Sequence, residues 1–233
     1  MNSSGFKATL TAAPPGFPIT FPRTMPDNNS PADSAVHAKK SLRSQIRKQR
    51  RSLSAREQRI AGQKLAGLLS RQLFFLRARH LAFYLPNDGE IDPVFLLELA
   101  VAAGKQVYLP LLHPISHKSM VFVRWRPGDA LIPNRYGIPE PRWQPGLPPW
   151  LLDIVFMPLV AFDNRGNRLG MGGGFYDRTF ARGFAKPSLI GMAHHFQHTS
   201  SLPAEPWDVP LDAIATDTAL TFFNQPIPPT GTP

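Results

Sequence analysis

Short apolar runs and segments with helical spacing alternate along most of the chain. Two helices are predicted first, one from about Ala35 and one from the capping box Ser54-Ala-Arg-Glu57 to about residue 72. In both segments apolar residues recur every three or four positions, which gives each helix one face for burial and one for water.

A strand–helix–strand unit is predicted next. Residues 80–85 form a short apolar run that is typical of a buried strand. Asp92-Pro93 supplies an N-cap and a first-turn proline for a helix over residues 93–103, and the apolar residues 106–109 follow as a second strand. Such a unit implies a right-handed crossover and parallel pairing of the two strands.

The remaining pattern predicts more strands and one more helix. The strands are expected at residues 120–125, 153–157, 188–192 and 213–222, and the helix over residues 172–184. The alternation indicates the α/β class, a three-layer α/β/α single domain with a mostly parallel, Rossmann-like sheet. Ligands of such folds collect beyond the carboxyl ends of the strands, so the loops 86–92, 110–118 and 158–174 are the candidate site regions.

Composition sets the limits of this domain. The 233 residues, of which 42% are hydrophobic, can bury one substantial core. Residues 1–34 are rich in proline and lack hydrophobic periodicity, so a disordered N-terminal extension is expected there. Residues 225–233 are predicted to be a flexible tail for the same reason, which leaves residues 35–224 as the α/β domain. Either Met1 or Met25 could be the true start.

Several protein classes are excluded by what the sequence lacks. The chain has no cysteine, which excludes a disulfide framework, thiolate metal sites and cysteine nucleophiles, and which suits a reducing compartment. No apolar run approaches the roughly 20 residues that span a bilayer, and no secretory signal is recognisable. We therefore expect a cytoplasmic protein without a membrane partner.

The charge of the chain is uneven. The formal net charge is +10, and nine basic residues between Lys39 and Arg59 are opposed only by Glu57. Such a run is either a solvated helix face or a surface for anions, with nucleic acid and nucleotides as the two candidates. Lys39 and Arg43 are four positions apart, so a helix would place both on one face.

A glycine-rich loop carries the most unusual composition. Gly170, Gly172, Gly173 and Gly174 stand directly before a predicted helix, where flexible backbone amides can turn toward a phosphate. Arg168 and Arg178 flank the loop, and Asp177 offers a hard oxygen ligand for Mg²⁺. The loop is neither a phosphate-binding Walker A loop, which would end in Lys-Ser/Thr, nor a dinucleotide fingerprint, which needs glycine where Phe175 stands.

The segment Arg168-Leu-Gly-Met-Gly-Gly-Gly-Phe-Tyr-Asp177 closely resembles the ATP-binding signature of the 5-formyltetrahydrofolate cyclo-ligases, or 5,10-methenyltetrahydrofolate synthetases. The resemblance spans about residues 38–220. Further motifs follow in the family's order: Lys39-Lys-Ser-Leu-Arg43, Tyr84-Leu-Pro86 with Glu90-Ile-Asp92, Tyr136-Gly-Ile-Pro-Glu-Pro141, Phe156-Met-Pro158 with Phe162-Asp163, and Glu205-Pro-Trp-Asp208.

The resemblance implies a reaction of 5-formyltetrahydrofolate with ATP and Mg²⁺. The formyl oxygen would attack the γ-phosphate to give a phosphorylated imidate, N10 would close the ring, and ADP and phosphate would leave. It also implies roles for individual residues. The catalytic residues would be Arg168, Tyr176 and Lys39; the ATP-binding residues Lys39, Arg43, Arg168, Gly170, Met171, Gly172, Gly173, Gly174, Phe175 and Tyr176; the folate-binding residues Glu90, Tyr136 and Tyr176; and the Mg²⁺ ligands Asp177 and Asp208.

Two alternatives stay open at this point. A family member could bind folate without catalysis, or the basic helix at residues 39–59 could make the chain a nucleic-acid-binding module. The resemblance favours a monomeric ATP-dependent enzyme without a nucleic-acid partner.

Overall fold

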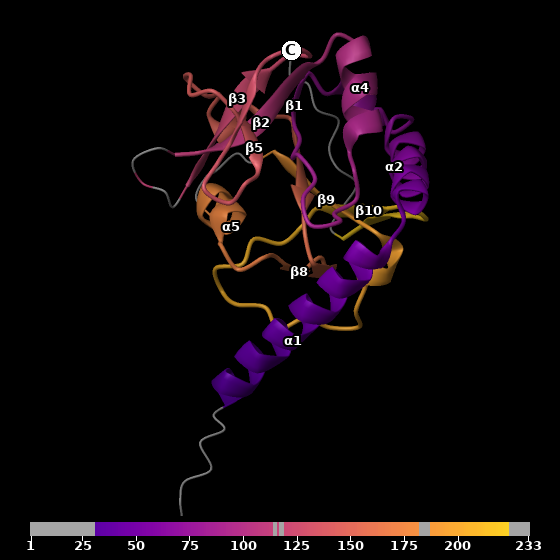
Figure 1. Ribbon diagram of the computed structural model, residues 1–233, viewed down its shortest axis with the longest axis vertical. Coiled ribbons are helices and arrows are strands. Elements are labelled where there is room, and N and C mark those ends of the chain that lie inside the picture. The colour runs from indigo at the N-terminus through magenta and orange to yellow at the C-terminus, as the bar shows by residue number, and fades with distance from the viewer. Residues whose placement is uncertain (1–30, 114–115, 117–118, 182–186, 224–233) are drawn as a thin grey trace, which may run out of the picture.

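The computed structural model describes residues 31–113, 116, 119–181 and 187–223. The predictions for residues 1–30 and for the tail at 225–233 lie outside the described residues. Helix α1 (Pro31–Ser52) begins inside the segment that the sequence predicts as an extension. In Figure 1 this helix runs diagonally below the sheet, and its N-terminal turns project from the rest of the domain.

The sheet confirms the predicted α/β fold. Its seven strands lie in the order β11-β10-β9-β6-β1-β2-β3, of which β10, β9, β6, β1 and β2 run parallel. The two edge strands, β11 and β3, are antiparallel to their neighbours. The strand bounds are β1 (His80–Ala82), β2 (Gln106–Leu112), β3 (Met120–Trp125), β6 (Ile154–Pro158), β9 (Ser188–Ala193), β10 (Ala213–Thr216) and β11 (Leu220–Phe222).

Helices cover both faces of the sheet. Helices α2 (Ala55–Leu69), α3 (Leu73–Arg77) and α4 (Val94–Ala102) pack on one face, and α5 (Phe175–Phe180) packs on the other (Figure 1). Successive strand residues point to opposite faces. In β6, Phe156 therefore belongs to the core under α2 and α4, whereas Val155 and Met157 belong to the core under α5.

The capping box is present as predicted, whereas the start of α4 is shifted by one residue. The amide of Ser54 donates to Glu57 Oε2 at 2.8 Å, and the amide of Glu57 donates to Ser54 Oγ at 3.3 Å, which completes the capping box. At α4 the N-cap position is held by Pro93 and not by Asp92, although Asp92 Oδ1 accepts a hydrogen bond from the amide of Val94 at 2.9 Å. The predicted parallel pairing of the two strands around α4 is confirmed, since His80 pairs with Gln106.

Some boundaries differ from the prediction. The helix expected to reach residue 72 ends at Leu69, and α3 follows as a separate turn. The helix expected over 172–184 covers only Phe175–Phe180, and residues 182–186 lie outside the described part of the chain. The strand expected over 213–222 is a β10–β11 hairpin. No described helix is both long and apolar enough to cross a membrane.

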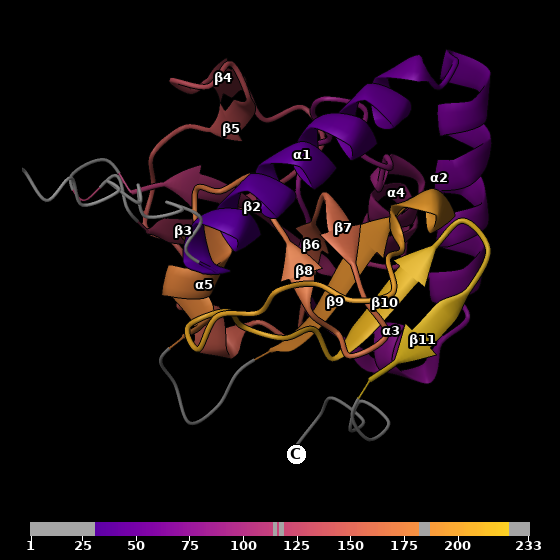
Figure 2. The same ribbon diagram turned by 90° about the horizontal axis from the view of Figure 1, so that it is seen from below.

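Short elements form the remainder. Two small antiparallel pairs stand apart from the main sheet (Figure 2), namely β4 with β5 and β7 with β8. Their bounds are β4 (Leu131–Pro133), β5 (Pro139–Pro141), β7 (Ala161–Phe162) and β8 (Arg168–Leu169), and the 3-10 turns are η1 (Pro149–Leu151) and η2 (His195–Gln197).

The strand order places a switch point at the centre of the sheet. From β1 the chain proceeds outward to β2 and β3, then returns to β6 on the other side of β1 and proceeds outward to β9 and β10 (Figure 2). The loops that leave the carboxyl ends of β1 and β6 therefore diverge, and this divergence opens a crevice in such sheets.

Candidate active site

A cleft of about 850 Å³ lies at this switch point. The three loops expected to carry the site all contribute to it, together with α1, the β4–β5 pair and the segment 202–208. Every residue that the sequence predicts as part of the site lines this one cleft: Lys39, Arg43, Glu90, Tyr136, Arg168, Gly170, Met171, Gly172, Gly173, Gly174, Phe175, Tyr176, Asp177 and Asp208.

A buried aspartate fixes the turn that delivers Arg168. Asp163, fully buried between β7 and β8, accepts hydrogen bonds from the amides of Arg165 and Asn167 and, at 3.0 Å, from the amide of Leu202. Burial alone would raise the pKa of Asp163, but these bonds and the Asn167 side chain outweigh it and lower the pKa. The carboxylate thus holds the β7–β8 hairpin against the segment 202–208, which also lines the cleft.

The glycine loop, residues 170–174, presents unused backbone donors. Gly172 and Gly174 have φ angles of +97° and +61°, which side chains other than glycine rarely adopt. Among the described residues, the N–H groups of residues 171–173 donate to no protein acceptor. Free amides on a loop of this conformation form a concave donor site that suits an anion. Helix α5 has only six residues, so the loop amides provide the main support for anion binding.

Arg168 and Asp177 form an ion pair inside the cleft. Arg168 Nη2 donates to Asp177 Oδ1 at 2.6 Å, and the Arg168 side chain is only 5% exposed. The Nε of Arg168 is buried without a hydrogen-bond partner among the described residues. An unsatisfied buried donor is costly, and an anion beside this guanidinium would offer it an acceptor.

Helix α1 supplies two cations to the same end of the cleft. Arg43 Nε donates to the carbonyl oxygen of Gly170 at 2.8 Å, so the helix holds the glycine loop directly. Lys39 Nζ donates to Glu205 Oε1 at 3.1 Å. The spacing of four residues therefore places both side chains on the cleft face of the helix, as the sequence predicts.

The two predicted metal ligands both line the cleft. Asp177 Oδ1 accepts from Arg168 and from the amide of Val209, while among the described residues Oδ2 accepts no hydrogen bond. Asp208 Oδ2 accepts from the amide of Glu205 at 2.9 Å. Within the part of the chain that the structure describes, no three His, Asp or Glu side chains gather as a metal cluster. The donor set fits Mg²⁺, which usually takes one or two carboxylates and otherwise waters and substrate phosphates.

Glu90 lines the cleft from the loop after β1. Its Oε2 accepts from the amide of Asn87 at 3.1 Å, and its side chain is 11% exposed. Burial raises the pKa of Glu90 to about 7, against the lowering effect of the nearby Arg50 guanidinium. Burial and the proximity of Glu90 together raise the pKa of Tyr176, which therefore stays protonated as a hydrogen-bond donor.

Aromatic side chains surround the mouth of the cleft. Tyr136, in the turn between β4 and β5, meets the Phe175 ring edge to face at 6.3 Å. Trp207 lines the same mouth and is 67% exposed. Neither Trp207 nor Glu205 is among the site residues predicted from the sequence. Both stand in the Glu205-Pro-Trp-Asp208 motif, which was the available signal.

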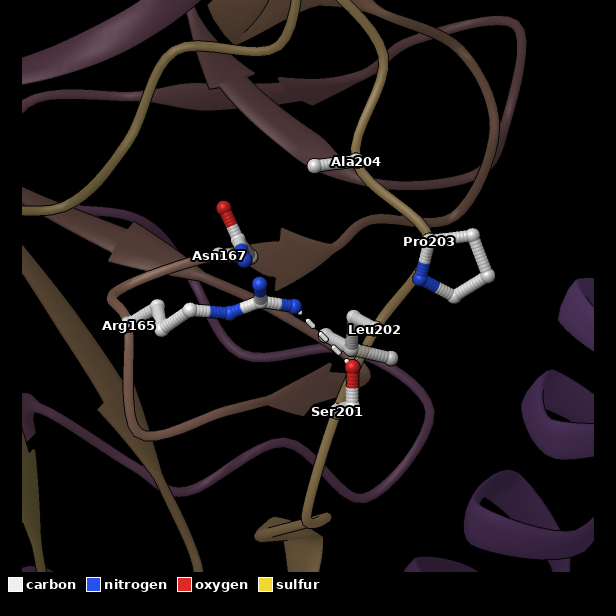
Figure 3. A pocket seen from close by; sticks show the side chains of 6 residues that line it. All are labelled: Arg165, Asn167, Ser201, Leu202, Pro203 and Ala204. Atoms are coloured by element: carbon white, nitrogen blue, oxygen red, sulfur yellow. Dashed lines mark hydrogen bonds between the residues drawn. The ribbon is translucent and has the colours of Figure 1, made fainter.

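Two charged residues of the cleft region, one acidic and one basic, are not among the site residues predicted from the sequence. Asp88 lines the cleft beside Glu90, and Arg50 lies fully buried behind them. A second, shallower hollow of about 680 Å³ lies beside the β7–β8 turn (Figure 3). There Arg165, an exposed residue, donates to Ser201 Oγ at 3.0 Å, and the hollow brings together none of the predicted site residues.

The sheet and its cleft define the class of protein: an α/β enzyme whose ligands bind at a topological switch point. The sequence model of the 5-formyltetrahydrofolate cyclo-ligase family matches residues 35–217, and the chain belongs to this family.

Relatives and solved structures agree with this assignment. The chain is 42% identical over 174 residues to the 5-formyltetrahydrofolate cyclo-ligase of Escherichia coli K12, a match that covers 73% of this chain and 96% of that protein. The Haemophilus influenzae cyclo-ligase is also 42% identical, over 173 residues and with coverage of 73% and 92%. The 5,10-methenyltetrahydrofolate synthetase of Aquifex aeolicus superposes with a TM-score of 0.70 at 30% identity, covering 81% of this chain and 94% of that one.

Proposed function

We propose that the chain converts 5-formyltetrahydrofolate and ATP to 5,10-methenyltetrahydrofolate, ADP and phosphate in a reaction that needs Mg²⁺. The observation that carries this proposal is the set of groups that line one cleft. Unused amides and cations gather at the glycine loop, and the buried carboxylate of Glu90 lines the same cleft from the loop after β1. The amides and cations suit a triphosphate, and the carboxylate suits the N–H edge of a pterin.

On the ATP side, binding of the nucleotide would make two cations exchange their ion-pair partners. In the structure Lys39 is paired with Glu205 and Arg168 with Asp177. A bound triphosphate would take both cations, and the amides of residues 171–173 would hold further phosphate oxygens. Phosphoryl transfer depends mainly on such positioning and on neutralisation of the equatorial oxygens. Arg43, which already holds Gly170, would keep the loop in place.

Mg²⁺ would be held by Asp177 and Asp208. When bound it would neutralise phosphate charge and fix the in-line geometry of transfer. The same exchange that gives Arg168 to a phosphate releases Asp177 Oδ1 from its 2.6 Å contact, so both oxygens of this carboxylate become available for the cation.

The folate side would use Glu90, Tyr136 and Tyr176. The Glu90 carboxylate would accept hydrogen bonds from the pterin, and Tyr136 at the mouth would pack against the ring system. Tyr176 follows the glycine loop directly and lies close enough to Glu90 for that carboxyl to raise its pKa. It therefore stands between the two ligands and would donate a hydrogen bond near the reacting atoms.

The chemistry then follows from the poor leaving ability of an amide oxygen. The formyl oxygen attacks the γ-phosphorus, the bond to the β-phosphate oxygen breaks, and ADP leaves. The resulting imidate carries phosphate on its oxygen. N10 attacks the formyl carbon and loses its proton, and the C–O bond breaks to release phosphate and close the ring. Arg168 and Lys39 would neutralise the charge that moves along the phosphates.

The nucleic-acid alternative loses its main support in the structure. Within the described residues, five cations of the basic run contact groups of the cleft or its loops, namely Lys39, Arg43, Arg47, Arg50 and Arg51. Non-catalytic folate binding stays a distinct outcome of the test below.

The test is growth of the methenyl-folate absorbance band with purified protein, 5-formyltetrahydrofolate, Mg²⁺ and ATP. We expect the band to grow only when ATP is present, and to be lost in Arg168→Ala and Asp177→Ala. Lys64→Ala, on the exposed side of α2, is the control that should keep the activity. Folded protein that binds folate without this signal would be a folate-binding protein. Salt-sensitive binding to DNA or RNA without folate binding would restore the nucleic-acid alternative.

A further inference from the structure

A buried arginine ties the folate-side loop to the centre of the sheet. Arg50, near the end of α1, has a side chain with 0% exposure. Its Nη2 donates to Asp88 Oδ2 at 2.9 Å, and its Nη1 donates to the carbonyl oxygen of Leu159 at 3.2 Å. The same Nη1 lies 3.8 Å from Glu90 Oε1. One guanidinium therefore bridges the loops that follow β1 and β6, the two strands at the switch point.

The backbone of the loop is fitted closely to this arginine. Asp88 and Gly89 have φ angles of +52° and +72°, so two consecutive residues take the left-handed conformation. A Cβ on Gly89 would lie 2.8 Å from the carbonyl carbon and oxygen of Arg50, which is closer than atoms can approach. Gln58, from α2, donates from Nε2 to the carbonyl oxygen of Gly89 at 3.0 Å and to that of Arg50 at 3.4 Å, so it bridges the two backbones.

Burying an arginine side chain costs free energy of folding unless its charge and N–H groups are well paired. The Nε of Arg50 has no hydrogen-bond partner among the described residues, so its contacts are not optimised for stability alone. A hydrophobic residue of similar size would fill the space at lower cost. What only an arginine can do here is hold two carboxylates and one carbonyl oxygen through a rigid planar group.

We propose that Arg50 is a positioning residue for folate binding: it fixes Glu90 at the place in the cleft from which the carboxylate contacts the pterin. The inference rests on the proposed role of Glu90. Arg50 itself lies behind the loop and touches no ligand; Asp88 is the second anchor through which it holds the loop.

The charges around Glu90 add a pH signature to the contacts. Arg50 faces it from α1, Asp88 from its own loop, Tyr84 from the end of β1 and Tyr176 from α5. Burial raises the pKa of Glu90, and Arg50 is the group that lowers it. Loss of the guanidinium would raise this pKa further. As the pH is lowered, folate binding would therefore begin to decline at a higher pH than in the unaltered protein.

A double-mutant cycle tests the inference with the full chain. Arg50→Lys keeps a positive charge but cannot reach both carboxylates and the Leu159 carbonyl together. Binding of 5-formyltetrahydrofolate and of Mg–ATP is measured separately by calorimetry in the unaltered protein, Arg50→Lys, Glu90→Gln and the double variant. Because a displacement of about 1 Å can cost ~100-fold in such a site, we expect Arg50→Lys to weaken folate binding at least tenfold. We expect Mg–ATP binding to be unchanged.

The cycle separates the two roles. In the Glu90→Gln background, Arg50→Lys should have little further effect on folate binding, because the group that it positions is already altered. Equal weakening in both backgrounds, or parallel loss of Mg–ATP binding, would overturn the inference. If Glu90→Gln alone leaves folate binding unchanged, the proposed contact of Glu90 fails, and this result is obtained with Arg50 intact.

One further variant is a control, and another replaces Arg50→Lys if that variant does not fold. Lys48→Met removes an exposed cation of the same helix and should change neither binding constant. If Arg50→Lys does not fold, Asp88→Asn weakens the same anchor from its partly exposed side. It should then weaken folate binding, keep Mg–ATP binding, and lose its effect in the Glu90→Gln background; any other result refutes the inference.

Discussion

Replacing Glu90 by glutamine should stabilise the folded chain at pH 8 while it removes folate binding. The carboxyl has a pKa of about 7 in the folded protein, against 4.5 when it is exposed to water. The folded state therefore binds the proton more tightly, and ionisation disfavours folding. A shift of this size corresponds to about 3 kcal/mol of lost stability once the group is ionised in both states. Glutamine keeps the shape and removes the charge.

The sign of the pH dependence is fixed by these two values. Below pH 4.5 the carboxyl is protonated in both states and the penalty is absent. It grows as the pH rises from 4.5 and is complete above about 7, so the variant should gain on the unaltered protein across this interval. Urea unfolding of both proteins at pH 5 and pH 8 measures the gap. We expect it to widen by about 2 to 3 kcal/mol toward pH 8.

The matched control is Glu98→Gln on the exposed side of α4. This variant measures the general effect of replacing a glutamate by glutamine, and the effect at position 90 is taken relative to it. A gap for Glu90→Gln that is constant or narrows toward pH 8 would refute the reasoning. Glu90 would then be stabilised as an anion in the folded state, and burial would not dominate its environment.

Three other predictions concern the remaining contacts of the cleft. Glu205→Gln should tighten Mg–ATP binding by about twofold to fivefold, because the partly exposed ion pair between Glu205 and Lys39 would no longer compete with the phosphates for Lys39. Calorimetry measures the affinity, and weaker binding would show that Glu205 helps to hold the nucleotide. Asp177→Asn should lower the cyclisation rate at least ~100-fold and raise the Mg²⁺ concentration needed for half-maximal rate, whereas a normal Mg²⁺ requirement would remove its role as ligand. Gly89→Ala should destabilise the fold by about 1 to 3 kcal/mol in urea unfolding, because the φ of +72° and the backbone of Arg50 leave no room for Cβ; an unchanged midpoint would show that the loop moves freely.

The regular part of the fold was predictable because its signals are local. The capping box, the Asp92-Pro93 start and the apolar run at residues 80–85 are all read within a few positions, and the unit they predict is the one around α4. The prediction failed where pairing decides the structure. Strands β7 and β8 have two residues each, too short for a periodic signal, and they exist because Asp163 holds their turn.

The candidate site was predictable for a different reason. Glycine, arginine and aspartate in the loop at residues 168–177 have few purposes in common other than phosphate and metal chemistry, and the family resemblance places the other residues around them. The structure brings all of them to one cleft. The position of Arg50 could not be predicted, because the sequence does not show whether an arginine is buried or exposed to solvent. Only the burial and the two facing carboxylates distinguish the two cases.

The basic run of α1 shows how one composition can serve both interpretations. Lys39, Arg43, Arg47 and Arg50 recur every three or four positions and so lie on one side of the helix. Along this side the partners change from Glu205 and Gly170, at the proposed nucleotide end of the cleft, to Asp88, near the proposed folate contact Glu90. Lys48 points away from this side, and both Lys40 and Lys48 are exposed. The run is therefore not a purely solvated face. One helix contacts the residues of both proposed ligand sites, so a displacement of α1 would affect the proposed nucleotide and folate sites together.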